Sequence, residues 1–249
     1  MNNIQDNLKY LKLPHIEKNY EREAEAAAKE NLTHIEYLEK LVQDETNAKW
    51  ERSIRKKIKQ AGFPTVKTID TFDFNWPKKI NKQLVLKLMD LEFINRNGNV
   101  VIIGVPGTGK SHIAQAIGYK ACCSGISTKY ITAIDIVNEL TAAMADNTFM
   151  PKLRFYEKVP LLLIDELGPL PTDKRGADLL FQVISKRYEK GSIILTSNRA
   201  FKEWGEIFGR DNTTASGVIE RLCHHGDILK VEGDSYRLKD KKKKNLGLE

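Results

Sequence analysis

Five short apolar runs lie between residues 100 and 232, and turn residues or helical patterns separate them. Strands that alternate with helices predict a parallel α/β sheet, and unbroken Val, Ile and Leu runs are typical of strands covered on both faces. The pattern predicts a five-stranded parallel sheet in an α/β domain over residues 81–249. The expected strands are 100–104, 129–132, 161–165, 192–197 and 228–232, with helices around 110–123, 134–145, 174–190 and 214–224.

The first 60 residues have a purely helical pattern. The stretch EREAEAAAKE is rich in strong helix formers, and apolar residues recur at helical spacing after it. Gly62 and Pro64 end the pattern. We predict a small N-terminal helical domain over 1–60 and a connector over 61–80. The apolar positions expected to line helix faces are Ile35, Leu38, Leu41 and Val42, followed by Trp50, Ile54 and Ile58.

Composition adds few constraints. Hydrophobic residues make up 41% and charged residues 29% of the chain, which is ordinary for a protein with a buried core. No apolar stretch approaches the roughly 18 residues that a membrane span needs, and the first residues lack a secretory signal. Three cysteines give neither a disulfide framework nor a CxxC pair. We expect a cytoplasmic protein without membrane contact, in which Cys122 and Cys123 are core residues and His224 and His225 lack clustered metal-binding partners.

The first apolar run leads directly into GVPGTGKS, and a helical pattern follows. This fits the phosphate-loop pattern G-x-x-x-x-G-K-[ST], whose backbone N–H groups face an anion at a helix N-terminus. Lys110 is expected to contact the β- and γ-phosphates of ATP, and Ser111 to coordinate Mg²⁺. The expected nucleotide-binding residues are Gly104, Val105, Pro106, Gly107, Thr108, Gly109, Lys110, Ser111 and His112.

The run LLLID ends on two adjacent carboxylates, Asp165 and Glu166. Buried carboxylates are unfavourable unless something positive meets them, and Mg²⁺ bound to ATP is a suitable partner. Asp165 is expected at the sheet edge near Ser111, where it holds Mg²⁺ directly or through water. Glu166 is expected to point elsewhere and to polarise the attacking water as general base. The pair favours ATP hydrolysis over phosphoryl transfer to a second substrate.

Three further residues are candidates for contact with the γ-phosphate. The strand SIILTSN ends on Asn198, a neutral amide that can position the water or the phosphate. Arg221, in VIERL, and Arg237, in GDSYRL, flank the last strand. Arginine is always charged and matches phosphate geometry, so either residue is suited to stabilise charge on the γ-phosphate.

The order GVPGTGKS, LLLIDE, ILTSN, VIERL and DSYR resembles the AAA+ ATPases of the DnaC/IstB type. The stretches LGPLPTDKRGADLLFQ, NRAFKEWGEIFG and HHGDILKVEGDSYRLK are similar more narrowly to IstB, a helper protein of bacterial insertion sequences. The resemblance covers residues 1 to 240. It implies an AAA+ P-loop ATPase that forms homo-oligomers on duplex DNA and recruits and stimulates a transposase.

The resemblance also implies a role for individual residues. Lys110 and Ser111 match Walker A, Asp165 and Glu166 match Walker B, and Asn198 matches sensor 1. Arg221 resembles an arginine finger that enters a neighbour's site, and Arg237 resembles sensor 2, with its direction toward its own or a neighbour's nucleotide left open. Only 12 residues follow Arg237, so the usual helical lid is truncated. The basic tail that begins KDKKKK is expected to be solvated.

Two basic stretches are candidate DNA contacts, in keeping with a net charge of +7. The stretch IVNELTAAMADNTFMPKLRFYEK resembles the helical insertion of initiator-type AAA+ proteins and contains Lys152 and Arg154. The helical pattern near residue 55 contains Arg52, Arg55, Lys56 and Lys57. For either stretch a solvated helix face is the alternative. Without a module that reads base edges, we expect contact with the DNA backbone and little sequence specificity.

A helicase loader of the DnaC/DnaI type is the main alternative function, because it uses the same ATPase core. Some of those loaders carry an N-terminal cysteine-based zinc site, and no cysteine precedes Cys122 here. A metabolic P-loop kinase would need a lid and acceptor-binding arginines that the sequence does not reveal.

Overall fold

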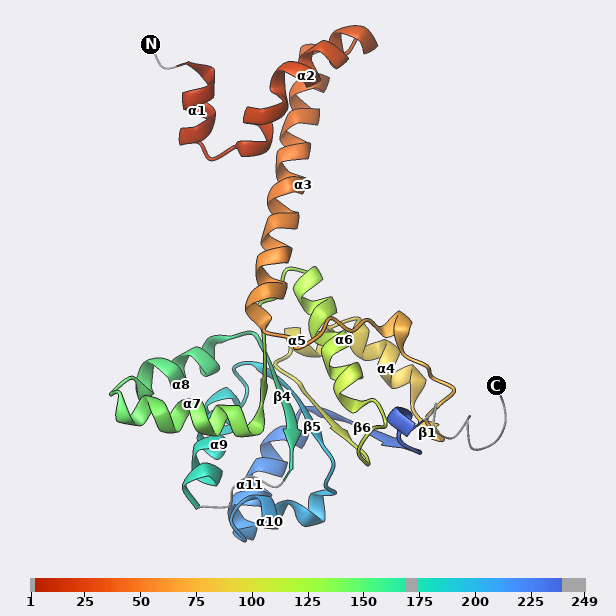
Figure 1. Cartoon of the computed structure of the whole chain (residues 1–249), viewed down its shortest axis with the longest axis vertical. Helices are drawn as coiled ribbons and strands as arrows, with labels where there is room; N and C mark the ends of the chain where they lie inside the picture. The colour runs from red at the N-terminus through yellow and green to blue at the C-terminus, as the bar shows by residue number, and fades with distance from the viewer. Residues whose placement is uncertain (1–2, 169–173, 239–249) are drawn as a thin grey trace. The chain divides into compact units, whose positions relative to one another are not determined.

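The computed structural model describes residues 3–168 and 174–238 (Figure 1). The chain divides into two compact units, Met1–Lys56 and Lys57–Glu249, and the boundary falls within helix α3 (His34–Ala61). None of the helices formed by the described residues combines the length and the apolar character of a bilayer span. The basic tail after residue 238 lies outside the described residues.

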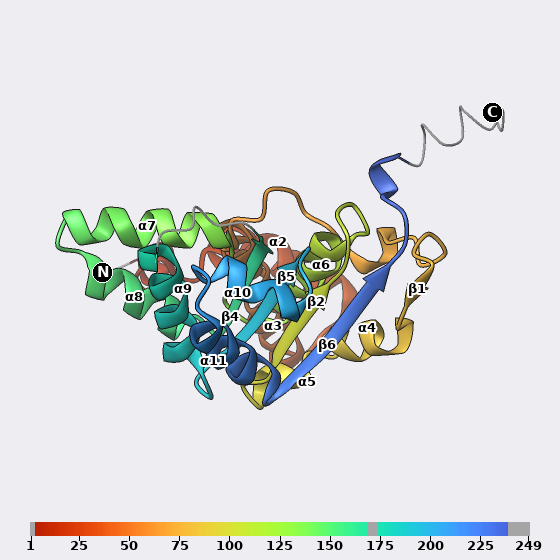
Figure 2. The ribbon, with the colours of Figure 1, turned by 90° about the horizontal axis from the view of Figure 1, so that it is seen from below.

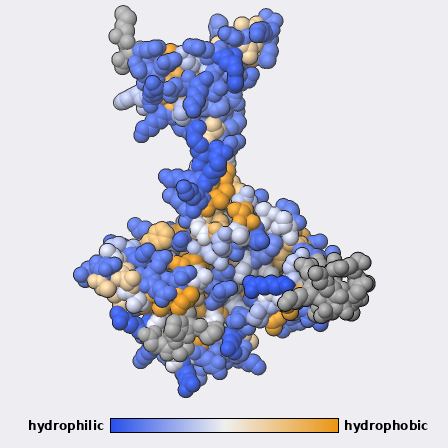
Figure 3. All heavy atoms as spheres, viewed as in Figure 1, coloured by the Kyte–Doolittle hydropathy of each residue, from blue (hydrophilic) through white to orange (hydrophobic). Residues whose placement is uncertain are grey.

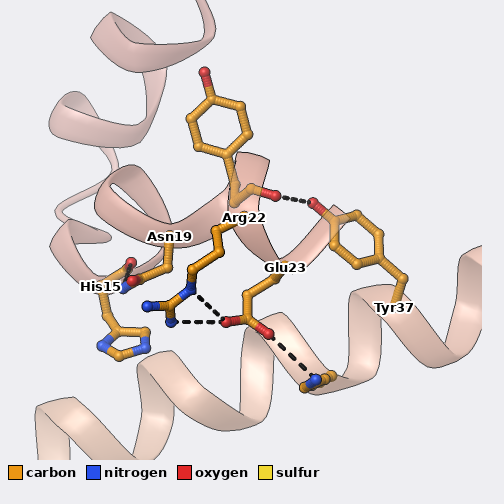
Figure 4. Close-up of polar contacts among 7 residues, drawn as sticks. His15, Asn19, Arg22, Glu23 and Tyr37 are labelled. Atoms are coloured by element: carbon orange, nitrogen blue, oxygen red, sulfur yellow. Dashed lines mark hydrogen bonds and ion pairs between the residues drawn. The ribbon is translucent and has the colours of Figure 1, made fainter. Parts of the chain in front are cut away.

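The first unit is helical, as the sequence predicts. It contains α1 (Ile4–Tyr10), α2 (Pro14–Glu30) and the first part of α3. Thr33 and Glu36 start α3 with a capping box, in which each side chain bonds the other residue's backbone N–H. The Tyr37 hydroxyl donates to the Tyr20 carbonyl oxygen over 2.8 Å, and the Lys40 ammonium lies 3.2 Å from the Glu23 carboxylate (Figure 4). These contacts join α2 and α3 side by side.

The face of α3 that packs on α2 differs from the one expected. Of the four apolar residues predicted to line one face, only Leu41 is buried, whereas Ile35, Leu38 and Val42 are exposed, and so is Trp50. Hydrophilic side chains dominate the visible surface of this unit (Figure 3). The buried positions include a charged residue at helical spacing from Leu41, so hydrophobicity alone does not identify the packed face.

That charged residue is Glu45, which is only 3% exposed. Its carboxylate accepts hydrogen bonds from the backbone N–H groups of His15 and Ile16 at 2.7 and 3.0 Å, and from the Arg52 guanidinium at 2.9 Å. Burial raises the pKa of Glu45, but the bonds from Ile16, Arg52 and His15 outweigh it and leave the pKa below its ordinary value. Glu45 therefore satisfies two free N–H groups at the start of α2 from a neighbouring helix.

We expect Glu45→Gln to destabilise the first unit by about 1–3 kcal/mol, because a buried charge-assisted network is broken. Amide hydrogen exchange at His15 and Ile16 should accelerate. In the native protein the stabilisation should be complete above the ordinary pKa of 4.5 and should disappear as the pH falls through the lowered folded value. Glu51→Gln, at an exposed ion pair of the same helix, is the control. Equal exchange rates in the two variants would contradict the assignment.

The second unit contains a six-stranded sheet with the strand order β1-β6-β2-β5-β4-β3. Figure 2 shows β6, β2 and β5 side by side. The five predicted parallel strands are confirmed; the sixth, β1, is a two-residue edge strand antiparallel to β6 and is too short to leave a sequence pattern. The strands are β1 (Lys79–Ile80), β2 (Asn99–Ile103), β3 (Thr128–Thr132), β4 (Leu161–Leu167), β5 (Ser192–Ser197) and β6 (Gly226–Glu232).

Helices cover both faces of this sheet. One hydrophobic cluster joins the sheet to α4 (Lys82–Met89), α5 (Glu92–Asn95) and α6 (Lys110–Cys123). Cys122 is buried in α6 as predicted, whereas Cys123 is only half-buried. The cluster on the other face includes α7 (Ala133–Ala145), α9 (Lys174–Arg187) and α11 (Asn212–Cys223). The remaining elements are η1 (Ile69–Thr71), α8 (Phe149–Lys158), η2 (Phe201–Glu203), α10 (Trp204–Ile207) and η3 (Tyr236–Leu238).

Candidate nucleotide-binding site

The loop between β2 and α6 has the backbone conformation of a phosphate-binding turn. Gly107 and Gly109 have φ angles of 80° and 95°, in the left-handed region that favours glycine. A Cβ atom on Gly107 would lie 2.1 Å from the Ser235 hydroxyl oxygen, and one on Gly109 would lie 2.6 Å from the Phe72 ring. Helix α6 begins at Lys110, so its first N–H groups have no helical partners and face the loop. This arrangement suits an anion.

Lys110 lies within the loop and is 8% exposed. Its ammonium donates to the Val105 carbonyl oxygen over 2.8 Å, and no carboxylate of the described residues lies within ion-pair distance of it. Burial lowers the pKa of Lys110; the Asp165 carboxylate opposes this shift, and the Arg237 guanidinium adds to it. A buried cation with only a carbonyl partner is suited to bind a phosphate group.

Asp165, at the end of β4, is 3% exposed and accepts hydrogen bonds from three hydroxyl groups. The Ser111 hydroxyl donates to Oδ1 over 2.9 Å, the Thr196 hydroxyl also donates to Oδ1, and the Tyr130 hydroxyl donates to Oδ2 over 2.6 Å. All three donors are neutral. A carboxylate and a hydroxyl oxygen side by side are ligands that Mg²⁺ prefers, so Ser111 and Asp165 fit this ion.

Glu166 diverges from Asp165 because the backbone of β4 is irregular there. The pairing register with β5 shifts between Ile164 and Leu167, and Glu166 has a φ angle of 59°. Its backbone N–H donates to the Thr196 hydroxyl oxygen over 3.0 Å, while its side chain is exposed. The two adjacent carboxylates therefore lie in different surroundings. Asp165 is buried against α6, and Glu166 is open to solvent.

Two cavities adjoin the loop, with volumes of about 480 and 400 Å³. Gly107, Lys110, Ser111 and Arg237 line both of them. The smaller also has Glu166, Thr196 and Asn198 in its wall, so it brings together the residues predicted to act on the γ-phosphate except Arg221. The larger lies against the segment between α3 and β1, and its wall includes Lys67, Thr71, Phe72, Asp73, Trp76, Pro77, His112, Gln115 and Tyr236.

The aromatic wall of the larger cavity was not predicted. Phe72 packs edge-on against His112, with ring centroids 5.3 Å apart, and the His112 Nε2 lies 2.8 Å from the Thr68 carbonyl oxygen. Trp76 packs in the same way against Tyr236, at 5.5 Å. The sequence signal was the aromatic stretch TFDFNWP, which we interpreted only as part of a connector. A cavity of this volume with aromatic residues in its wall suits a purine base.

The segment after β6 closes over the loop. The backbone N–H of Tyr236 donates to the Gly107 carbonyl oxygen over 2.8 Å, and the Trp76 indole N–H donates to the Asp234 carbonyl oxygen over 3.0 Å. Arg237, in the same short helix, lines both cavities of its own chain. Arg237 therefore lies beside the phosphate-binding loop of its own chain.

Arg221 lies elsewhere. Its guanidinium donates to the Gly217 carbonyl oxygen over 2.7 Å and lies 5.2 Å from the centroid of the Phe181 ring. The Arg221 carbonyl oxygen accepts a bond from Asn99, the first residue of β2, whereas the phosphate-binding loop follows the last residue of that strand. Arg221 therefore lies toward the opposite end of β2 from the loop and lines neither cavity.

The residues predicted to contact DNA differ in how freely they can do so. Arg154 and Lys56 are exposed, and Lys57 is half-buried. The ammonium of Lys152 lies 2.8 Å from the Glu139 carboxylate, and the guanidinium of Arg52 is bound to Glu45. Arg55 pairs with the exposed Glu51 at 3.4 Å. The pair of Arg55 with Glu51 has the i,i+4 spacing of one helix, whereas Lys152 and Glu139 are 13 residues apart and come from two helices, so helix spacing does not predict that pair.

His224 and His225 are exposed, and the prediction that they lack clustered partners is wrong. Glu189 lies beside them, with its carboxylate 3.2 Å from the His225 Nε2 atom, and one ligand atom from each residue lies within 4.8 Å of the others. Glu189 comes from the turn before β5, and the histidines come from the turn before β6. The sheet brings these distant segments together.

The chain is similar throughout to ATP-binding proteins of insertion sequences. The family model described as IstB-like ATP binding protein matches residues 6–244. The ATP-binding protein of insertion sequence IS5376 from Geobacillus stearothermophilus is 42% identical, over 93% of this chain and 92% of that protein. The ATP-binding protein of IS21 from Pseudomonas aeruginosa is 38% identical, over 98% of this chain and 91% of that protein.

Solved structures are similar in fold. AMPPCP-bound DnaA from Aquifex aeolicus superposes with a TM-score of 0.57 at 23% identity, over 74% of this chain and 56% of that one. The DnaC helicase loader superposes with a TM-score of 0.55 at 20% identity, over 66% of this chain and 96% of that one. The fold is that of the AAA+ P-loop proteins, as the sequence predicted.

Proposed function

Because this chain belongs to the family of IstB-like ATP-binding proteins, we propose that it is an ATPase that assembles on duplex DNA and recruits the transposase of an insertion sequence. ATP binding follows from membership of the family. Hydrolysis, assembly, DNA contact and transposase recruitment are the proposal. The observation that carries it is the smaller cavity, where the phosphate-binding loop, Glu166 and Asn198 share one wall.

For hydrolysis, we assign distinct roles to the polar residues in and beside that cavity. Lys110 and the N–H groups of the loop bind the β- and γ-phosphates. Ser111 and Asp165 would hold Mg²⁺, which when bound neutralises charge on the phosphates. Glu166 accepts the proton of the attacking water, and Asn198 orients that water or the γ-phosphate. Arg237, which lines both cavities, neutralises charge on its own chain's nucleotide.

Arg221 requires a second subunit for its role. Its position toward the far end of β2 keeps its guanidinium away from its own loop. In an assembly with head-to-tail contacts, one subunit's surface meets a different surface of the next subunit, so an arginine distant from its own site can enter a neighbour's. We therefore assign Arg221 to the site of the adjoining subunit.

Contacts between basic side chains and the phosphates of the DNA backbone supply the affinity for DNA. Arg154 is the first candidate, because it is exposed on α8 and forms no ion pair with the described residues. Lys152 would have to leave Glu139 to reach a phosphate, and Arg52 would have to leave Glu45. Arg55, Lys56 and Lys57 form the second candidate group. Contacts of this kind give affinity for most duplexes with little sequence preference, which suits insertion at many targets.

We expect duplex binding that requires ATP and weakens steeply with salt. Replacing Lys152 and Arg154 by alanine should lower the affinity and reduce the slope of log affinity against log salt by about 0.9 for each phosphate that is no longer neutralised. Nucleotide binding should be unchanged. Lys190→Ala, which removes an exposed lysine from the turn before β5, is the control. The measurement is a salt titration of fluorescent duplex and single-stranded DNA with ATP and with ADP.

The same titration separates this proposal from the helicase-loader alternative. A loader should favour single-stranded DNA, if it binds nucleic acid at all, and should bind a hexameric helicase tightly. Preference for the single strand, or duplex affinity that ignores ATP, would contradict the proposed function.

A further inference from the structure

Tyr130 contacts Asp165 but lines neither of the two cavities. Thr132 is the pairing partner of Asp165 across β3 and β4, and Tyr130 stands two residues earlier, opposite Leu163. Residues two apart on a strand share a face, so the phenol reaches Asp165 diagonally across the two strands. The hydroxyl donates to Oδ2, whereas Ser111 and Thr196 both donate to Oδ1. Tyr130 alone therefore fixes the second carboxylate oxygen among the described residues.

The ring of Tyr130 packs against the segment that leaves α3. The ring centroids of Phe63 and Tyr130 are 6.1 Å apart, and a Cβ atom on Gly118 of α6 would lie 3.1 Å from Phe63. Ala61, the last residue of α3, is fully buried, and a Cβ atom on Gly62 would lie 3.8 Å from the Tyr130 carbonyl oxygen. Gly62 has a φ of 76°, so this tight exit favours glycine.

A continuous set of contacts thus runs from the end of α3 through Phe63 and Tyr130 to Asp165. In this set the Tyr130 hydroxyl donates to Asp165 while its ring packs against Phe63. Because interiors are close-packed, a shift of Phe63 cannot leave the Tyr130 ring unaffected. A shift of that ring changes the bond that orients Asp165.

We propose that Tyr130 is a positioning residue that orients Asp165 for the metal. Through the contact of Tyr130 with Phe63, metal binding depends on the position of the segment that follows α3. The inference rests on the proposed Mg²⁺–ATP site and adds a means of regulating it. Groups that bond to metal ligands typically change metal affinity by about 10–100-fold when removed. An event that moves the exit of α3 would act on the ATP site through the same contacts.

The test is the binding of a fluorescent ATP analogue to the full chain, measured in EDTA and across a Mg²⁺ titration. Tyr130→Phe removes only the hydroxyl, so binding in EDTA should be unchanged while the Mg²⁺ concentration for half-saturation rises about tenfold. Tyr10→Phe, at an exposed tyrosine, should change neither value. An unchanged Mg²⁺ requirement in Tyr130→Phe would overturn the positioning role, as would an equal loss of binding in both conditions.

The link to α3 is tested by a double-mutant cycle. Phe63→Leu should raise the Mg²⁺ requirement less than Tyr130→Phe does, and it should add nothing when Tyr130 is already phenylalanine. If the two substitutions raise the Mg²⁺ requirement independently, so that their effects multiply in the double variant, the proposed link from Phe63 through Tyr130 to Asp165 is overturned. Nucleotide binding by the wild type that ignores Mg²⁺ would instead contradict the proposed site itself, so the two failures are distinguishable.

Discussion

Glu166→Gln should bind ATP and Mg²⁺ as the wild type does but hydrolyse ATP at least about 100-fold more slowly, because a positioned general base contributes 10²–10⁴-fold. The amide keeps the size of the side chain but does not accept the proton of the attacking water. Asp165, Ser111 and Lys110 are unaltered in this variant, so the phosphates and the ion should remain bound. ATP should therefore persist on the protein.

The measurement is steady-state phosphate release together with equilibrium nucleotide binding. Lys110→Ala should lose both, because it removes the buried cation of the loop. Glu189→Gln is a matched control, since Glu189 is also exposed and has the same φ of 59° as Glu166. It should hydrolyse ATP normally. Wild-type rates in Glu166→Gln would remove Glu166 from the role of base.

Mixing two inactive variants should restore part of the ATPase activity. A Lys110→Ala subunit keeps Arg221, and an Arg221→Ala subunit keeps its phosphate-binding loop. In a random equal mixture with head-to-tail contacts, about one quarter of the interfaces should pair an intact loop with an intact arginine. Phosphate release should rise from near zero toward that fraction of the wild-type rate as the ratio approaches one to one.

The control mixture combines Lys110→Ala with the double variant Lys110→Ala, Arg221→Ala. No interface of that mixture holds an intact loop, so no activity should return. Light scattering with DNA and ATP checks that mixed oligomers have formed. If they form without recovery at any ratio, Arg221 does not act on a neighbour's nucleotide.

The sheet and the phosphate-binding loop were predictable because their signals are local. A buried parallel strand needs an unbroken apolar run, and the loop needs glycine at set positions and a lysine where α6 begins. The antiparallel strand β1 left no comparable signal, since two residues, Lys79 and Ile80, cannot show an alternating pattern. The covered face of α3 was missed because its contacts include the carboxylate of Glu45.

The walls of the candidate site depend instead on residues distant in the sequence. Trp76 and Tyr236 meet although 160 positions separate them, and no spacing rule connects two such aromatics. Lys152 was predicted as a candidate DNA contact, and its ion pair with Glu139 of α7 arises only because α7 and α8 pack together. Tyr130 reaches Asp165 only because of the pairing register of β3 against β4. Such relations arise from the fold as a whole.

The backbone at Glu166 has a consequence for evolution. A residue other than glycine held at positive φ is strained by about 1–3 kcal/mol, and glycine or asparagine would relieve this strain. Selection for thermal stability alone would therefore replace Glu166. A general base at this position therefore exchanges stability for turnover, as is common where catalytic residues are strained. Copies of the gene released from selection for ATP turnover should then accumulate substitutions at this position early, and the proteins they encode should unfold at higher temperature.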